Sequence, residues 1–187
     1  MFCPRCLARV TQPAPTCAAC GFTGEHTLAM FPGAAPAMEE LMDTAGCWSE
    51  KESKFLREQL KRMRKRFPQI HWCLLSIHAS EQMSLRLFNF WFFNASPVPE
   101  PGDSEKRAWT ILLTYEKTLG QFAVMPGYQL EAMLSDDEWY DLLHTMKVSW
   151  REGGMRRAYR DFFRDAEVKL VAASKKMQEM IQRSRGR

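Results

Sequence analysis

Four of the six cysteines in this chain form two closely spaced pairs near its beginning. The pairs are Cys3 with Cys6 and Cys17 with Cys20, and two residues separate the members of each pair. Two thiolates at this spacing can face one metal ion from a tight turn, and a second such turn completes a tetrahedral shell of four sulfur atoms. The pattern therefore predicts a zinc site with Cys3, Cys6, Cys17 and Cys20 as its ligands.

A pair of disulfides is the alternative use of these cysteines. A disulfide across two intervening residues is typical of redox proteins, and this segment lacks the βαβ context of a thioredoxin-like motif. Gly21 follows the second pair, where such a turn often needs a positive φ. Leu7 follows the first pair, so we expect that turn to be less regular. With these features, residues 1–24 resemble the short zinc ribbons at the N-termini of many bacterial proteins.

The predicted zinc site is structural rather than catalytic, because four sulfur ligands leave no open position for a water molecule. The segment 1–24 is too short to bury enough apolar area to fold alone, so metal binding must supply its folding energy. A docking module and a nucleic-acid reader both remain open. Only Arg5 and Arg9 are basic within the ribbon, which favours docking and disfavours nucleic-acid binding.

The composition is that of a globular protein. The chain has 187 residues, of which 45% are hydrophobic and 26% charged, with a net charge of +4. Its length suits one ordinary domain in addition to the ribbon. No apolar run approaches the length of a membrane span, and no apolar segment after a basic start indicates a secretory signal. Thiol metal ligands together with these absences lead us to expect a cytoplasmic protein.

The remaining elements are expected to form the domain that positions these residues. We expect a linker over 25–42, a main domain over 43–165, and a C-terminal helical extension with a basic tail over 166–187. Predicted helices start at capping boxes at Ser49 and Ser135, and Ser80 can cap a further helix through Phe92. The predicted elements are helix 49–67, strand 70–77, helix 80–92, loop 95–107, strands 108–115 and 120–125, a helical turn at 128–134, and helices 135–151 and 155–181.

This order predicts an α/β fold. The short connection between strands 108–115 and 120–125 predicts an antiparallel hairpin, whereas the unit 70–115 predicts a right-handed crossover if its strands are parallel. Gly153 and Gly154 are expected to separate the last two helices. We therefore predict a layered domain with a small mixed sheet flanked by helices and preceded by the zinc ribbon.

Two further features have ordinary structural interpretations. The basic cluster at 61–66 suits a nucleic-acid surface, but it also suits the solvated end of a helix, where positive charge is favourable. Cys47 and Cys73 stand alone in the sequence and are interpreted as small apolar core residues rather than reactive thiols.

Several short motifs, in their order, resemble the TPM domain, a family found in bacteria and plastids. The resemblance covers about residues 43–165. In the family, an acidic residue precedes a capped helix, an apolar strand leads to a helix that ends near a tryptophan, and a glycine-tyrosine signature follows a hairpin. The corresponding segments here are Asp43 with Ser49, 72–77, 90–92, 109–114, Gly127-Tyr128-Gln129-Leu130-Glu131 and 159–163.

The resemblance implies a set of acidic residues that could bind a divalent cation. Some family members look like metal-dependent phosphatases, in which oxygen ligands would hold Ca²⁺ or Mg²⁺ against a phosphate. The matching positions are Asp43, Glu131 and Asp136, and Glu116 stands where relatives commonly have an acid in the hairpin. Local roles are equally open: Asp43 in loop hydrogen bonds, Glu131 as a cap, and Asp136 at the favourable start of a helix.

Three functions follow as hypotheses, of which nucleic-acid binding through 61–66 and the basic tail is the weakest. The first is a cytoplasmic binding or accessory protein whose ribbon and TPM-like domain dock another protein without turnover. The second is a divalent-metal-dependent phosphatase that uses Asp43, Glu116, Glu131 and Asp136. The sequence has no glycine-rich phosphate loop and no other familiar catalytic motif, which favours the first.

Overall fold

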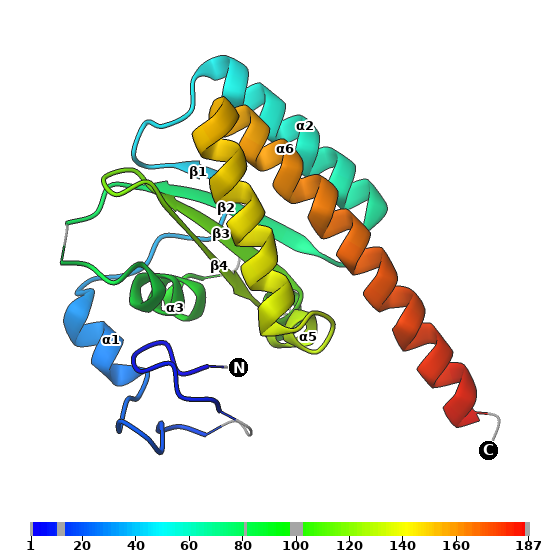
Figure 1. Ribbon diagram of the computed structural model, residues 1–187. Helices are drawn as coiled ribbons and strands as arrows, with labels where there is room; N and C mark the ends of the chain where they lie inside the picture. The colour runs from blue at the N-terminus through cyan, green and yellow to red at the C-terminus, as the bar shows by residue number, and fades with distance from the viewer. Residues whose placement is uncertain (1, 11–13, 81, 98–102, 186–187) are drawn as a thin grey trace.

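The computed structural model describes residues 2–10, 14–80, 82–97 and 103–185 of the chain. Within them lie ten helices and strands, which Figure 1 shows in chain order. They are α1 (Glu25–Met30), β1 (Leu41–Asp43), α2 (Glu50–Arg66), β2 (His71–Ile77), α3 (Leu85–Ala95), α4 (Asp103–Ala108), β3 (Thr110–Glu116), β4 (Gln121–Pro126), α5 (Tyr128–Glu131) and α6 (Asp136–Arg185).

The described strands form one mixed sheet in the order β1-β2-β3-β4. β1, β2 and β3 are parallel, and β4 is antiparallel to β3. Helices cover both faces of the sheet: α2 and α6 lie on one side and α3 on the other (Figure 1). The predicted α/β fold with a small mixed sheet is therefore confirmed, as is the antiparallel hairpin.

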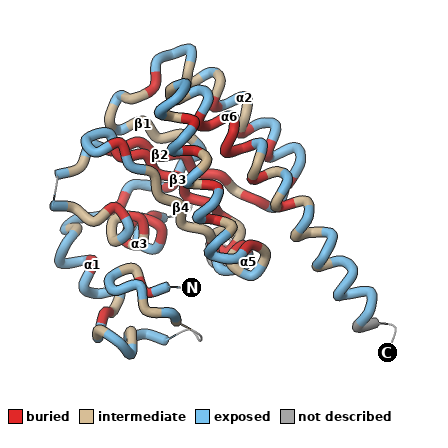
Figure 2. Tube along the Cα trace, in the orientation of Figure 1, coloured by how far each residue is buried: buried red, intermediate tan, exposed pale blue. Residues whose placement is uncertain are grey.

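The core has two parts because the sheet is covered on both faces. Trp72 and Leu74 of β2 pack on the side of α2 and α6, whereas Cys73 and Leu75 pack on the side of α3. This is why β2 is nearly continuously apolar in sequence. Figure 2 shows the buried residues concentrated in the sheet and along the helix faces that contact it.

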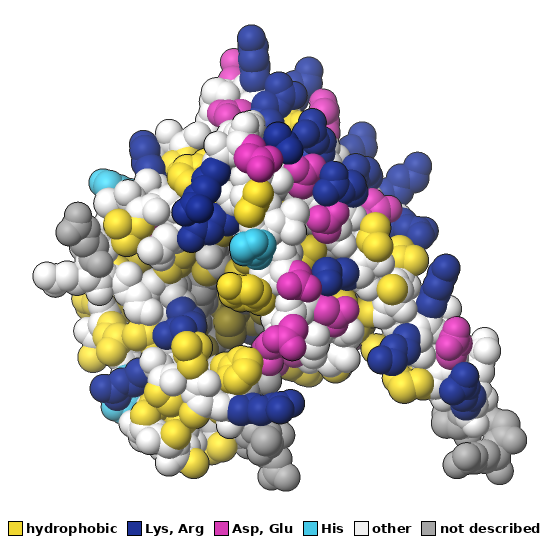
Figure 3. All heavy atoms as spheres, in the orientation of Figure 1, with side chains coloured by type: hydrophobic (Ala, Val, Ile, Leu, Met, Phe, Trp, Pro, Cys, Tyr) yellow, Lys and Arg dark blue, Asp and Glu magenta, His cyan; other side chains and the backbone are white. Residues whose placement is uncertain are grey.

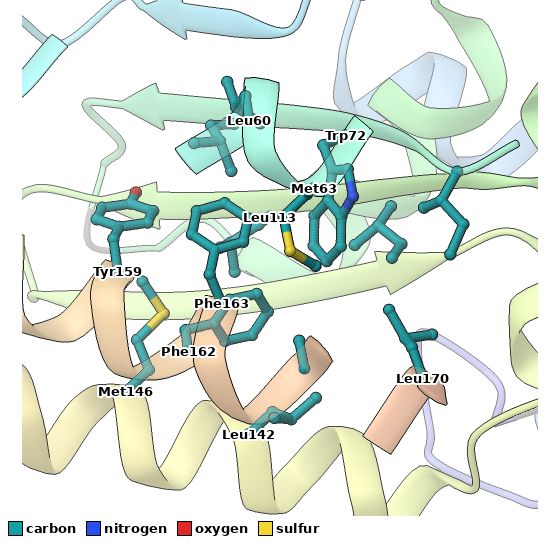
Figure 4. Close-up of a cluster of buried hydrophobic side chains, with 14 of the residues drawn as sticks. Leu60, Met63, Trp72, Leu113, Leu142, Met146, Tyr159, Phe162, Phe163 and Leu170 are labelled. Carbon is teal, nitrogen blue, oxygen red and sulfur yellow. The ribbon is translucent and has the colours of Figure 1, made fainter. Parts of the chain in front are cut away.

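Aromatic side chains of α6 belong to the larger of the two parts of the core. Tyr159, Phe162 and Phe163 are fully buried, and Figure 4 shows them extending from α6 toward Trp72 and Leu113 of the sheet. Trp72 lies edge-on to Phe163 with 5.2 Å between the ring centroids, a favourable aromatic arrangement. Ala166 and Leu170, further along the same arm of α6, are also fully buried.

α6 is a hairpin of two helical arms rather than one straight rod. Gly154 has φ 72° and ψ −170°, a backbone conformation that only glycine adopts readily. The first arm begins at the predicted capping box, since the Ser135 amide donates to Glu138 Oε2 at 2.8 Å and the Glu138 amide donates to Ser135 Oγ at 3.3 Å. The second arm extends past the body of the domain (Figure 1).

Some local predictions differ from the structure. Ser84, not Ser80, caps α3 through its hydroxyl, which accepts from the Leu87 amide. The predicted loop 95–107 contains α4 near its end, because a six-residue polar helix leaves no apolar periodicity. The stretch 25–42, expected as a linker, includes α1 and the first two residues of β1, and it buries Ala35 and Met38 against the α3 side of the sheet.

Among the described helices, none combines the length and apolar character needed to cross a membrane.

Candidate metal centre and acidic residues

Two matching turns bring the four N-terminal cysteines together. In the first turn, the Leu7 amide donates to the Cys3 carbonyl at 3.0 Å, and in the second the Gly21 amide donates to the Cys17 carbonyl at 2.8 Å. Leu7 and Gly21 both have positive φ, 62° and 69°. The first turn is therefore as regular as the second, although leucine adopts this conformation at a cost of roughly 1–2 kcal/mol.

The spacing of the sulfur atoms fits a tetrahedral metal site. Cys3 Sγ lies 3.8 Å from Cys20 Sγ, and Cys6 Sγ lies 3.8 Å from Cys17 Sγ. All four sulfur atoms lie within 4.8 Å of one another. A zinc–sulfur bond of about 2.3 Å in a regular tetrahedron separates the sulfurs by about 3.8 Å. The cluster can therefore hold one metal ion, and these distances are far too long for disulfide bonds, which are about 2.05 Å.

The thiols of this cluster have divergent acidities. Backbone amides of Ala19 and Cys20 hydrogen-bond the Cys17 sulfur and lower its pKa to about 7. Desolvation and the neighbouring sulfurs raise the pKa of Cys20 to about 12. Several thiolates crowded at this distance repel one another, and a bound cation removes that repulsion. The donor set thus suits a soft or borderline metal bound by thiolates.

The ribbon is attached to the domain through α3. Arg86 Nε donates to the carbonyl of Pro4, inside the first cysteine turn, at 2.7 Å. Phe22, which is buried, lies edge-on to Phe90 with 5.6 Å between ring centroids. α1 packs on the same helix, and Figure 1 shows the N-terminal segment beside α3. Sequence reasoning missed Arg86, because an isolated arginine on a helix carries no signal of its partner.

Asp43 lies at the carboxyl end of β1, where its carboxylate organises the following loop. Its Oδ1 accepts from the Cys47 amide at 2.8 Å and its Oδ2 accepts from the Trp48 amide at 2.9 Å. Ser76 Oγ of β2 also donates to Oδ1. Burial alone would raise the pKa of Asp43, but these hydrogen bonds outweigh it and lower the pKa. Ser76 was also missed, although it is polar within an apolar run.

Glu116 ends β3 and closes the turn of the hairpin in the same way. Its Oε1 accepts from the amides of Thr118 at 2.7 Å and Ala79 at 3.2 Å, and its Oε2 accepts from the Leu119 amide at 2.8 Å. The side chain is buried, with 3% of the residue exposed. Burial would raise the pKa of Glu116, but the donated hydrogen bonds lower it.

Glu131 and Asp136 lie at the opposite end of the sheet. The Gly127 amide donates to the Thr110 carbonyl at the start of β3, which places α5 at that end, whereas Asp43 and Glu116 end their strands. Burial raises the pKa of Glu131, and the negative charge of Asp136 adds a smaller increase. The four acids therefore do not form one site, and among the described residues the cysteines are the only cluster of potential metal ligands with three or more members.

Comparison with known proteins establishes the fold only. No family model matches the sequence, and no match is found among curated proteins. Among solved structures, the chain is similar to the N-terminal domain of a protein from P. gingivalis, determined by solution NMR. The TM-score is 0.54 and the sequence identity 14%, over 81% of this chain and 93% of that chain. The similarity supports the α/β architecture and leaves the function to the residues.

Proposed function

We propose that this protein is a cytoplasmic accessory protein, with a TPM-like domain and one structural zinc ion, that binds another protein without catalytic turnover. The observation that carries the proposal is how Asp43 and Glu116 use their carboxylates. Backbone amides of neighbouring loops occupy oxygens of both groups. A cation would have to compete with these hydrogen bonds, so the two acids fit loop closure better than metal catalysis.

The metal centre supports the same function. Cys3, Cys6, Cys17 and Cys20 would all ligate zinc, which leaves no position for a water or a substrate. Zinc bound there would fix the fold of a segment that is otherwise too short to fold. When bound, the ion would link the two cysteine turns to each other through its bonds to the four sulfur atoms.

Exposed apolar side chains at the N-terminal end support protein binding. Phe2 and Leu7 of the ribbon are 43% and 53% exposed, and Leu28 and Met30 of α1 are 57% and 47% exposed. Figure 3 shows apolar side chains gathered over this part of the molecule. Groups of large exposed apolar side chains commonly mark protein interfaces.

A divalent-metal-dependent phosphatase is the second candidate. Asp43 and Glu116 lie at the carboxyl ends of parallel strands, the edge of an α/β sheet where ligands commonly bind. In this alternative, Ca²⁺ or Mg²⁺ would displace some of the amide donors from these carboxylates. Glu131 and Asp136 would take no part, because they lie at the other end of the sheet.

One experiment separates the two functions. Zinc content is measured by mass spectrometry on the purified protein, and p-nitrophenyl phosphate turnover is then followed with and without Ca²⁺, Mg²⁺ or Mn²⁺. The same assays are run on Asp43→Ala and Glu131→Ala. One zinc per chain, no turnover, and a loss of thermal stability in Asp43→Ala support the accessory function. Ion-dependent turnover that disappears in Asp43→Ala while the variant stays folded contradicts it.

A further inference from the structure

A polar groove runs between the two arms of α6. His144, Thr145, Val148, Ser149 and Glu152 line it from the first arm, and the second arm contributes Arg157, Arg160, Asp161 and Arg164. The groove has a volume of about 580 Å³ and opens to solvent. It exists because the reversal at Gly154 sets the arms side by side. None of the acidic or cysteine residues discussed above belongs to it.

A buried carboxylate forms the floor of the groove. Asp161 is 7% exposed, and its Oδ2 accepts from Ser149 Oγ of the opposite arm at 2.7 Å. This hydrogen bond, together with the nearby arginines, lowers the pKa of Asp161 although burial opposes it. Asp161 therefore stays ionised at neutral pH and provides a fixed negative charge.

Three guanidinium groups gather around this one carboxylate. Arg164 Nη1 lies 2.9 Å from Asp161 Oδ1, Arg157 Nε lies 3.6 Å from Oδ2, and Arg160 Nε lies 3.7 Å from Oδ1. A single guanidinium is enough to neutralise a buried carboxylate, so this cluster holds more positive charge than Asp161 needs. Asp161 thus acts as an anchor that holds three arginines at the wall of one groove.

The arginines differ in how much of their charge remains for a ligand. Arg157 also contacts Glu152 at 2.9 Å, and Arg164 also contacts Asp165 at 2.8 Å. Arg160 contacts Asp161 alone among the acidic groups of the described chain, and its side chain is 60% exposed. The lining of the groove carries three arginines against the two carboxylates of Glu152 and Asp161. One positive charge is therefore in excess along the lining of the groove, and Arg160 is the arginine of the three that has no second carboxylate beside it.

We propose that this groove binds an acidic segment of the partner protein, an inference that rests on the accessory function proposed above. The planar guanidinium matches a carboxylate through paired hydrogen bonds, and three at one wall can engage successive acidic side chains. Val148, 39% exposed, adds an apolar contact for the stem of such a side chain.

The test uses the zinc-loaded protein of residues 1–187 and a fluorescein-labelled hexaglutamate peptide, with binding followed by fluorescence anisotropy. Arg160→Gln removes the accessible charge, and Arg57→Gln on the outer face of α2 is the control with the same change in net charge. We expect Arg160→Gln to weaken binding about tenfold, the effect of losing one charge-assisted hydrogen bond. Arg57→Gln should stay within about twofold of the unchanged protein. Val148→Glu, which adds repulsion inside the groove, should also weaken binding.

Three results would overturn the proposal. These are no binding by the unchanged protein, equal losses in Arg160→Gln and Arg57→Gln, or displacement by inorganic phosphate at the same concentration as by unlabelled peptide. The last result would assign the groove to a phosphate group instead. Circular dichroism verifies that each variant is folded. If the peptide does not bind, only the groove proposal is refuted. The accessory function is tested separately, by the assay for metal-dependent phosphatase turnover.

Discussion

The hairpin turn offers a sharp test of how the acidic residues work. Replacing Glu116 by Gln keeps the size and shape of a side chain of which only 3% is exposed. The carboxylate accepts from three backbone amides through two oxygens, whereas a glutamine amide has one oxygen and one NH₂ group. Whichever way the amide is turned, at least one of the three backbone N–H groups faces another donor.

The expected loss of stability follows from the number of backbone amides that lose their acceptor. Taking the acceptor from one partly buried amide and weakening the remaining charge-assisted hydrogen bonds lowers the free energy of unfolding by about 2 kcal/mol. For a protein of this size, that loss lowers the melting temperature by about 4–8 °C. Guanidinium unfolding followed by circular dichroism, at fixed metal content, measures the free energy directly. Glu131→Gln is the matched control, and it should be neutral or stabilising because burial raises the pKa of Glu131 and thus disfavours its charge.

The pH dependence of the same variant gives an independent measurement. The pKa of Glu116 is lowered in the folded protein, so its stabilising effect is fully present above the unfolded-state pKa of about 4.3. It is lost as the pH falls from there through the folded pKa. The stability difference between the unchanged protein and Glu116→Gln should therefore shrink in acid. A cost below about 0.5 kcal/mol at neutral pH, or one that does not change with pH, would refute the reasoning.

Four further changes test other parts of the structure. Cys17→Ser should abolish binding of the metal and unfold the ribbon, since one of four ligands is lost, and mass spectrometry with circular dichroism checks this. Arg86→Ala removes the hydrogen bond to the Pro4 carbonyl, so amide hydrogen exchange in residues 2–10 should accelerate while that of the sheet stays unchanged. Phe163→Ala should cost about 3–5 kcal/mol by opening a cavity in the core, measured by urea unfolding. Gly154→Ala should cost about 1–3 kcal/mol, because alanine resists the backbone conformation there, and a melting temperature equal to that of the unchanged protein would contradict this.

The parts of the fold that the sequence predicts well are those fixed by local pattern. The apolar run of β2, the short hairpin connection and the Ser49 and Ser135 capping boxes each depend on residues a few positions apart. β1 was missed because it has three residues, all half-buried, and its partner Leu74 lies far along the chain. A strand this short is defined by its neighbour rather than by its own sequence.

The same distinction applies to the candidate sites. The four cysteines were predictable because the spacing within each pair determines the turn that presents both thiols. Asp43 and Glu116 lie at one end of the sheet and Glu131 lies at the other. These positions depend on how the strands pair, which cannot be read from residues a few positions apart. The three arginines around Asp161 also escaped prediction, because Ser149 and Asp161 meet only once the chain reverses at Gly154.

The attachment of the ribbon to α3 couples two equilibria. The hydrogen bond from Arg86 and the contact of Phe22 with Phe90 form only when the cysteine turns are folded. Because folding of the cysteine turns is linked to metal binding, the free energy of this attachment also increases the affinity of the four cysteines for the ion. An isolated peptide of residues 1–24 would release its metal more readily than the intact chain. The domain thus sets the metal concentration at which its own N-terminal segment becomes ordered.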